Sequence, residues 1–155
     1  MPEGRAKGFG FARYKNLASY AAVVVEIEAE QDVRLRHVWC AADAGLVIAP
    51  DGARNQLEGG IIQGASFVMR EQVRFEDGRS ALKSWDDYPI LRFTDIPKIE
   101  IELIDNPNEP TLGLGECSVG PTGAAIGNAV ARALGARIRH LPLTRERIEA
   151  TLLAQ

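Results

Sequence analysis

The stretch SYAAVVVEIE at residues 19–28 decides the fold, because it combines β-branched residues with a closing alternation of apolar and charged side chains. Such alternation has the period of a strand that faces a core on one side only. A second apolar stretch over 33–41 follows the polar pair Gln31-Asp32, which predicts a turn between the two stretches. The pattern therefore predicts an antiparallel hairpin as the first element of the fold.

Further strands are predicted in the second half of the chain. Residues 98–104 read KIEIELI, so the apolar residues at the odd positions face a core and the two glutamates face water. One wet face is typical of antiparallel pairing. The segments 72–76 and 79–84 flank Asp77-Gly78, a turn dipeptide that predicts a second hairpin. Residues 85–97 are expected to form a long connection.

Three helices complete the prediction. The first runs over about 53–71, the second from Ser118 or Thr122 to Leu134, and the third from its cap at Thr144 through Ala154. The fold class is therefore α+β, with an antiparallel or mixed sheet of about five or six strands and about three packed helices in a single domain. The predicted inward residues are Leu57, Ile61, Ala65, Val68 and Met69 in the first helix, Ile126, Ala129, Val130 and Ala133 in the second, and Ile148 and Leu152 in the third.

Glycines in two places carry structural information. Gly135 follows the second predicted helix and is expected to end it. Gly59, Gly60 and Gly64 lie inside the first predicted helix, where each costs about 1 kcal/mol relative to alanine. Three together predict close packing against a sheet, another helix or a ligand.

Length and composition indicate one globular domain. The chain has 155 residues, of which 46% are hydrophobic and 25% charged, and its formal net charge is −3. This charge gives no reason to expect nucleic acid or an anionic membrane as a partner. No apolar run is long enough for a membrane span, so a soluble protein is expected. Residues 1–19 are predicted to be a loop or flexible arm, and 20–155 the folded domain.

Glu116 is the first candidate for chemistry. It lies in GLGECSVGP at residues 113–121, between glycines and before a run of small residues that predicts a helix. Two interpretations are open. Glu116 is a general base that faces a ligand pocket, or it is a carboxylate that satisfies backbone N–H groups at a helix start.

Gln63 is the second candidate, in the glycine-lined stretch EGGIIQG at residues 58–64. Its amide either hydrogen-bonds a polar ring or phosphate, or lies exposed to water like most helical glutamines. The glycine pairs at 8–10 and 113–115 complete no GxGxxG pattern, and no P-loop lysine follows them. Nucleotide-binding loops of these two kinds are therefore excluded.

Cys117 beside Glu116 is a third candidate, since a thiol near a helix start can be activated as a nucleophile. Its base would have to be His37 or His140, and neither lies in a recognisable motif. We expect His37 to be structural within its strand and His140 to lie at the surface. The only other cysteine, Cys40, is far away in sequence, so the pair forms no zinc or disulfide pattern.

Four segments form a set when they are considered together. They are CAADAG at 40–45, NQLEGGIIQG at 55–64, YPILRF at 88–93, and LGE at 114–116 followed by AAI at 124–126. In this order and spacing they resemble the C-terminal part of the large, molybdenum-binding subunit of the xanthine dehydrogenase/aldehyde oxidase family. The likeness is strongest to the bacterial two-subunit branch that includes the isoquinoline 1-oxidoreductase β subunit, and it covers the chain from about Gly8 onward.

The resemblance implies roles for three residues. Glu116 matches the family's catalytic base, which takes a proton from a water activated by molybdenum, so that water supplies the oxygen for an aldehyde or N-heteroaromatic substrate. Gln63 matches a glutamine that contacts the molybdopterin, and Leu114 matches a residue that lines the same cofactor. The implied cofactor is molybdopterin with molybdenum, in its cytosine dinucleotide form, and 2Fe-2S clusters are implied on a separate small subunit.

The sequence departs from the family at Ile48-Ala49-Pro50, where Ile-Asn-Pro is frequent, and at Cys117, where Ala or Ser is usual. The family's large subunit is several times longer than this chain. The resemblance therefore implies two partners, the remainder of the large subunit and the small iron–sulfur subunit, and a chain that is inactive alone. The alternative is a stand-alone, non-catalytic α+β domain that forms a homo-oligomer or binds another partner. Both cytoplasm and periplasm remain open as the compartment.

Overall fold

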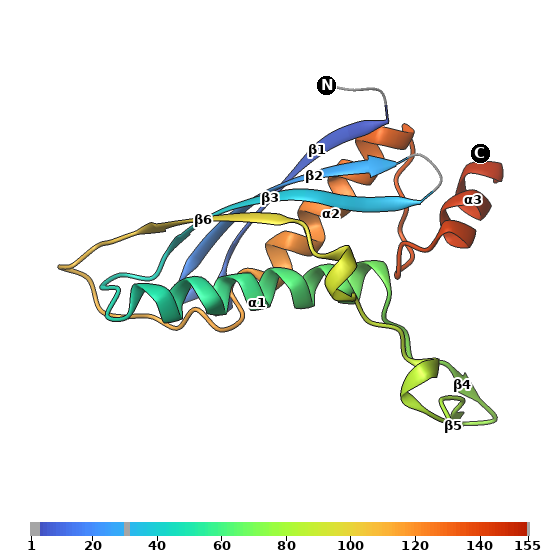
Figure 1. Cartoon of the computed structure of the whole chain (residues 1–155), viewed down its shortest axis with the longest axis horizontal. Coiled ribbons are helices and arrows are strands. Elements are labelled where there is room, and N and C mark those ends of the chain that lie inside the picture. The colour runs from blue at the N-terminus through green and yellow to red at the C-terminus, as the bar shows by residue number, and fades with distance from the viewer. Residues whose placement is uncertain (1–3, 30–31, 155) are drawn as a thin grey trace.

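A four-stranded sheet organises the structure, which is a computed structural model that describes residues 4–29 and 32–154. The strands β1, β2 and β3 are antiparallel neighbours, whereas β6 pairs parallel to β3 (Figure 1). The predicted first hairpin and the strand over 98–104 are confirmed, but β6 belongs to a parallel pair and not to the antiparallel one expected. In the sheet order β1-β2-β3-β6, the strands are β1 (Arg5–Arg13), β2 (Tyr20–Ala29), β3 (Val33–Asp43) and β6 (Lys98–Ile104).

Three α-helices accompany the sheet, α1 (Pro50–Met69), α2 (Val119–Leu134) and α3 (Arg145–Leu153). α2 packs on β1 and β2, α1 contacts α2 and β6, and α3 lies at one end of the sheet (Figure 1). Two predicted end signals are confirmed, since Thr144 Oγ1 accepts a hydrogen bond at the start of α3 and Gly135 ends α2 with a φ of 69°, whereas α1 begins and ends earlier than the predicted 53–71. In the described ranges, none of the helices has the length and apolar character needed to cross a bilayer.

The strand β1 corrects the prediction of a loop or flexible arm over 1–19. Residues 5–13 pair with β2 along the whole strand, and residues 1–3 lie outside the described residues. Gly8 and Gly10 concealed this strand, because glycine disfavours strands. A Cβ at either position would lie 2.0 or 2.1 Å from a carbonyl oxygen of α2. Only glycine allows the helix to approach so closely, and the strand is therefore part of the folded domain.

The core lies between the sheet and the two long helices. The five residues predicted to face inward on α1 are all buried, whereas Leu152 of α3 is 38% exposed and its predicted inward position is wrong. A bulge at Arg36 shifts the register of β3 against β2, so Leu35 and Val38 both face the core. The fully buried strand residues that meet the helices are Ala21, Val23, Val25, Ile27 and Val38.

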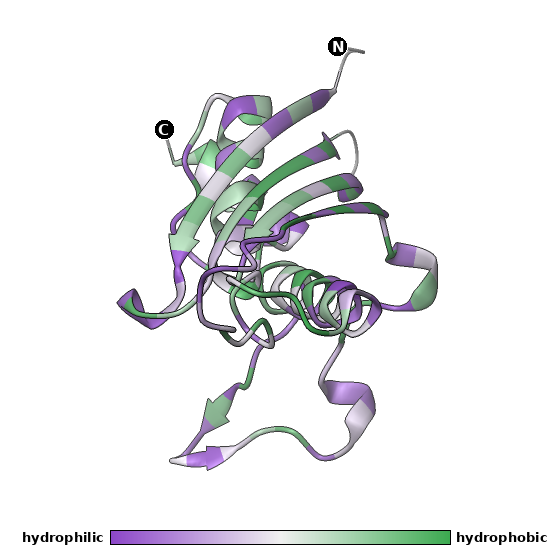
Figure 2. Ribbon diagram, turned by 90° about the vertical axis from the view of Figure 1, so that its left-hand side faces the viewer, coloured by the Kyte–Doolittle hydropathy of each residue, from purple (hydrophilic) through white to green (hydrophobic). Residues whose placement is uncertain are grey.

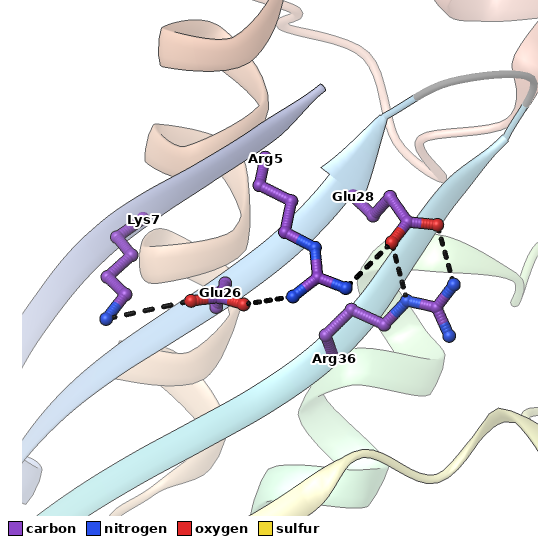
Figure 3. Close-up of polar contacts among 5 residues, drawn as sticks. All are labelled: Arg5, Lys7, Glu26, Glu28 and Arg36. Carbon is purple, nitrogen blue, oxygen red and sulfur yellow. Dashed lines mark hydrogen bonds and ion pairs between the residues drawn. The ribbon is translucent and has the colours of Figure 1, made fainter. Parts of the chain in front are cut away.

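The opposite face of the sheet carries charged pairs (Figure 3). The Arg5 guanidinium lies 3.0 Å from Glu26 and 3.2 Å from Glu28, and Arg36 lies 2.6 Å from Glu28. Lys7 lies 3.6 Å from Glu26. The hydrogen bond from Arg36 is the main reason why the pKa of Glu28 is lowered. Water and salt screen pairs at a surface, so this network supports the strand pairing only modestly.

Residues 72–97, which we call the excursion segment, leave the domain after α1 and return to it before β6, and their middle part with β4 and β5 extends away from it (Figures 1 and 2). The predicted second hairpin is present but short, with β4 (Phe75–Glu76) and β5 (Arg79–Ser80) around the Asp77-Gly78 turn. The remaining short elements of the fold are three single-turn 3-10 helices, η1 (Tyr14–Asn16), η2 (Trp85–Asp87) and η3 (Phe93–Asp95).

Candidate functional site

The loop 113–118, which we call the glutamate loop, leads into α2 and is held by two other parts of the chain. Ser19 Oγ donates a hydrogen bond of 2.6 Å to the carbonyl oxygen of Gly113. Ser118 Oγ donates one of 3.0 Å to the carbonyl oxygen of Leu57 in α1. Both serines are fully buried, and a hydrogen bond in such a place contributes about 1 kcal/mol. The β1–β2 connection and α1 therefore fix the loop that carries Glu116.

Glu116 is exposed, and its side chain does not cap the following helix. Its backbone carbonyl accepts a hydrogen bond of 3.2 Å from the N–H of Val119, the first residue of α2. Its carboxylate Oε2 instead accepts a hydrogen bond from the hydroxyl of Tyr14. Within the described ranges the carboxylate hydrogen-bonds to no backbone N–H group of α2. The interpretation of Glu116 as a carboxylate that satisfies a helix start is therefore wrong.

Tyr14 is a site residue that sequence reasoning missed. It lies just after β1, within the segment predicted to be a loop or flexible arm, so nothing connected it with Glu116. The hydrogen bond to the Glu116 carboxylate is the main reason why the pKa of Tyr14 is raised, with burial as the next cause. The phenol is therefore a stable hydrogen-bond donor at neutral pH, beside the only carboxylate of the glutamate loop.

Gln63 and the glutamate loop meet at one surface groove of about 460 Å³ on the outer side of α1. Gln63 lies exposed in the groove, and Gly115 contributes backbone from the loop. Leu114 is different, because its side chain packs partly against the hydrophobic core and does not line the groove. The groove is lined by Gln56, Gly59, Gly60, Ile62, Gln63, Ser66, Glu71, Ile90, Leu91 and Gly115.

Of the three glycines in α1 considered above, two allow close packing and one faces the groove. A Cβ at Gly60 would lie 2.3 Å from Ser118 Oγ, and one at Gly64 would lie 2.7 Å from the carbonyl oxygen of Val119. A Cβ at Gly59 would meet nothing within 4 Å. Close packing is therefore confirmed at Gly60 and Gly64, where α1 meets the start of α2. Gly59 instead leaves backbone open on the groove surface.

The structure contradicts the role of Cys117 as a nucleophile. Its side chain is 2% exposed, and burial raises the pKa of its thiol, which opposes the reactive thiolate form. His37 stacks on Trp39 with ring centroids 3.8 Å apart, as expected for a structural residue of its strand. His140 is exposed, as predicted. In the part of the chain that the structure describes, no three His, Cys, Asp or Glu side chains gather as metal ligands.

The groove has the donors and acceptors of a site for an organic ring. Gln56 and Gln63 supply amides that both donate and accept hydrogen bonds, and the open backbone at Gly59, with the exposed Gly115 beside Gln56, allows close approach of a flat group. A metal held here would have to arrive with ligands of its own, because the described residues form no direct cluster for one. The arrangement therefore fits one wall of an organic cofactor site.

Comparison with known proteins also indicates a site for an organic cofactor. Residues 2–97, more than half of the chain, match the family model for a molybdopterin cofactor-binding domain. One nicotinate dehydrogenase subunit from Pseudomonas putida is 39% identical over 96% of the chain, and the beta subunit of isoquinoline 1-oxidoreductase from Brevundimonas diminuta is 36% identical over 90%. The chain spans 13% and 18% of the lengths of these two relatives.

The solved structures support the fold. The crystal structure of quinoline 2-oxidoreductase from Pseudomonas putida 86 matches 88% of this chain and 19% of that chain, with a TM-score of 0.74 and 29% identity. The predicted α+β class, with a mixed sheet and three helices in one domain, is confirmed. The chain belongs to the molybdopterin cofactor-binding domain family, and its relatives are the molybdenum-binding subunits of the xanthine dehydrogenase/aldehyde oxidase family.

Proposed function

We propose that this chain forms the C-terminal part of a molybdenum hydroxylase that oxidises an aldehyde or N-heteroaromatic substrate with water as the oxygen source. The names of its relatives refer to nicotinate, isoquinoline and quinoline, which are N-heteroaromatic compounds. The observation that supports the proposal best is the shared groove, because Gln63 of α1 and Gly115 beside Glu116 line it together.

The groove residues are proposed to hold the cofactor, molybdopterin in its cytosine dinucleotide form with molybdenum. Gln63 hydrogen-bonds a polar edge of the organic group through its amide, and Gly59 and Gly115 allow that group to approach the backbone. Leu114 is proposed to line the cofactor site from beside the groove, because its partly buried side chain packs against the core and does not line the groove itself. When bound, this cofactor supplies the two-electron oxidation and the activation of water.

Glu116 is proposed as the general base. Its carboxylate accepts the proton that the attacking water loses, and a positioned base of this kind contributes about 10²- to 10⁴-fold to a rate. In this chain the carboxylate is exposed. Exclusion of bulk water from it therefore requires protein beyond the described residues.

The partners are proposed to be the remainder of the large subunit and a small subunit that carries 2Fe-2S clusters and accepts the electrons. Two observations support a partner. The chain spans only 13% and 18% of the two relatives, and large apolar side chains of the excursion segment lie in water. The chain alone is then expected to be inactive, because it supplies one wall of the cofactor site.

The test is co-expression of the chain with the remainder of a large subunit and an iron–sulfur subunit. Glu116→Gln should lower kcat by about 10²-fold or more while molybdenum content and subunit assembly stay unchanged. Unchanged turnover in the Glu116→Gln enzyme would show that Glu116 is not the base.

A second variant tests the cofactor role of Gln63. Gln63→Ala should lower the molybdenum and pterin content of the assembled enzyme. Asn55→Ala is the matched control, because Asn55 is an exposed amide on the same helix that does not line the groove. Equal cofactor content in both variants would contradict the role of Gln63.

A further inference from the structure

Tyr14 and Glu116 are joined across the fold. They are 102 residues apart in sequence, yet the Tyr14 hydroxyl donates a hydrogen bond to Glu116 Oε2. Tyr14 is the first residue of η1, in the connection between β1 and β2, and it packs partly against the hydrophobic core. In the described part of the chain, the Glu116 carboxylate hydrogen-bonds to no other side chain, so its Oε1 stays free of protein partners.

The backbone of the β1–β2 connection holds Tyr14 in place. Lys15 and Asn16 adopt left-handed conformations with φ of 50° and 59°, which cost a non-glycine residue free energy and persist only where the surroundings impose them. The Tyr14 N–H donates 2.9 Å to the Ser19 carbonyl, and the Ala18 N–H donates 3.0 Å to the Tyr14 carbonyl. The hydrogen bond between Tyr14 and Ser19 therefore closes a tight connection, and Tyr14 does not lie on a free loop.

A second bond joins the same two segments. Ser19 Oγ donates 2.6 Å to the carbonyl oxygen of Gly113, the first residue of the glutamate loop and three positions before Glu116. Ser19 is fully buried, so this bond is shielded from water. Two hydrogen bonds from one tight connection thus hold the glutamate loop, one to its backbone and one to its carboxylate.

We propose that Tyr14 is a positioning residue for Glu116, whose carboxylate it holds by one oxygen so that the other oxygen is left to accept the proton. The inference rests on the proposed function of Glu116 as the base. A carboxylate on an exposed loop otherwise samples several rotamers, and a donor that selects one of them lowers the entropy lost on reaching the reactive geometry.

The kinetic test uses the assembled enzyme described above. Tyr14→Phe keeps the ring and removes only the hydroxyl, and it should lower kcat about tenfold with KM and molybdenum content unchanged. Tyr20→Phe is the matched control, because Tyr20 lies six positions on, where its ring stacks against Phe11. Equal kcat in the Tyr14→Phe and Tyr20→Phe enzymes would overturn the proposal.

A spectroscopic test uses the chain alone and needs no cofactor. The absorbance of the phenolate reports tyrosine ionisation, and loss of one transition in Tyr14→Phe assigns the signal of Tyr14. Because the Glu116 carboxylate raises the pKa of Tyr14, Glu116→Gln should move that signal to lower pH. Glu71→Gln is the control, since it should move the signal of Tyr88 instead. An unmoved Tyr14 signal in Glu116→Gln would show that the contact does not form.

The two readouts separate this proposal from the function on which it rests. Turnover lost in Glu116→Gln but kept in Tyr14→Phe would overturn the role of Tyr14 and leave the base in place. Turnover kept in Glu116→Gln would overturn the base and with it the role of Tyr14 in catalysis, even if the phenolate signal moves. Turnover lost in Glu116→Gln, lowered in Tyr14→Phe and accompanied by a moved signal supports the proposal.

Discussion

The glutamate loop and the excursion segment both lack long regular elements, but the fold holds them in opposite ways. In the loop, Cys117 and Ser118 are buried, and Ser19 and Ser118 bond it to the core. The middle of the excursion segment extends away from the domain (Figure 2), and the side chains of Trp85 and Phe93 in this segment are 89% and 98% exposed. The chain thus builds its candidate catalytic loop into its own core, while most of the excursion segment lies outside that core.

This difference predicts which substitutions the isolated chain can tolerate. The excursion segment meets α1 and the residue that follows it through its second half, where the Leu91 N–H donates 3.1 Å to Ser66 Oγ and the Tyr88 hydroxyl donates 2.6 Å to Glu71. Changes at the exposed positions of the excursion segment should alter the free energy of global unfolding little, because few buried groups are lost there. Changes around the glutamate loop should alter it strongly.

The largest effect is expected for Gly64→Ala. The new Cβ would lie 2.7 Å from the carbonyl oxygen of Val119, which belongs to the helix backbone and moves only if α2 moves. Overpacking of this kind costs about 1–3 kcal/mol. Denaturant unfolding measures the loss, with Gly59→Ala as the control.

That control should behave in the opposite way. A Cβ at Gly59 meets nothing within 4 Å, so alanine there should stabilise α1 by up to about 1 kcal/mol. If Gly59→Ala and Gly64→Ala changed stability equally, the close packing of α1 on the start of α2 would be contradicted.

A smaller effect is expected for Ser118→Ala. The substitution removes a buried hydrogen bond to the Leu57 carbonyl and should lower the free energy of unfolding by about 1 kcal/mol. The matched change in the excursion segment is Ser84→Ala, which removes the cap of the single-turn η2. Because that turn is exposed and separate from the core, the free energy of unfolding should change by less than about 0.5 kcal/mol. Equal losses in the two variants would remove the contrast between the two regions.

The elements predicted from the sequence are those with local signals. The strict alternation of β6, the helical spacing along α1, and the end signals Gly135 and Thr144 all lie within one element or next to it. Local backbone and side-chain preferences were sufficient there, because tertiary packing agreed with them. The family resemblance gave roles to Glu116 and Gln63, which the sequence pattern had singled out as candidates without distinguishing them from ordinary helix residues.

The features that the sequence did not predict are non-local. The glycines of β1 disfavour a strand locally, and only the approach of α2 from more than a hundred residues away requires them. The parallel pairing of β6 with β3 depends on the route of the chain through α1 and the excursion segment. The contact of Tyr14 with Glu116 is also non-local, because β1 must first join the sheet before Tyr14 can reach the glutamate loop.

A still smaller effect is expected at the base of the excursion segment, for Tyr88→Phe. The hydrogen bond to Glu71 is the main reason why the pKa of Tyr88 is raised above its ordinary value near 10. A raised pKa in the folded state means that the stabilisation is complete below about pH 10 and is lost as the pH rises through the folded-state value. Wild type should therefore be slightly more stable than Tyr88→Phe at pH 8, and this difference should shrink at alkaline pH. A difference that stayed constant from pH 8 upward would show that the lost contact is not this hydrogen bond.

The smallest effect on the isolated chain is expected for Phe93→Ser in the excursion segment. The side chain is 98% exposed, so its loss should change the free energy of unfolding by less than about 0.5 kcal/mol. In the assembled enzyme the same change should lower the amount of large-subunit remainder that co-purifies, because burial of an apolar ring is then lost. Leu153→Ser is the control, since Leu153 is 89% exposed but lies on α3. A clear loss of stability in the isolated Phe93→Ser chain would mean that the excursion segment packs on its own domain. The contrast between the excursion segment and the glutamate loop would then not explain why the excursion segment needs a partner.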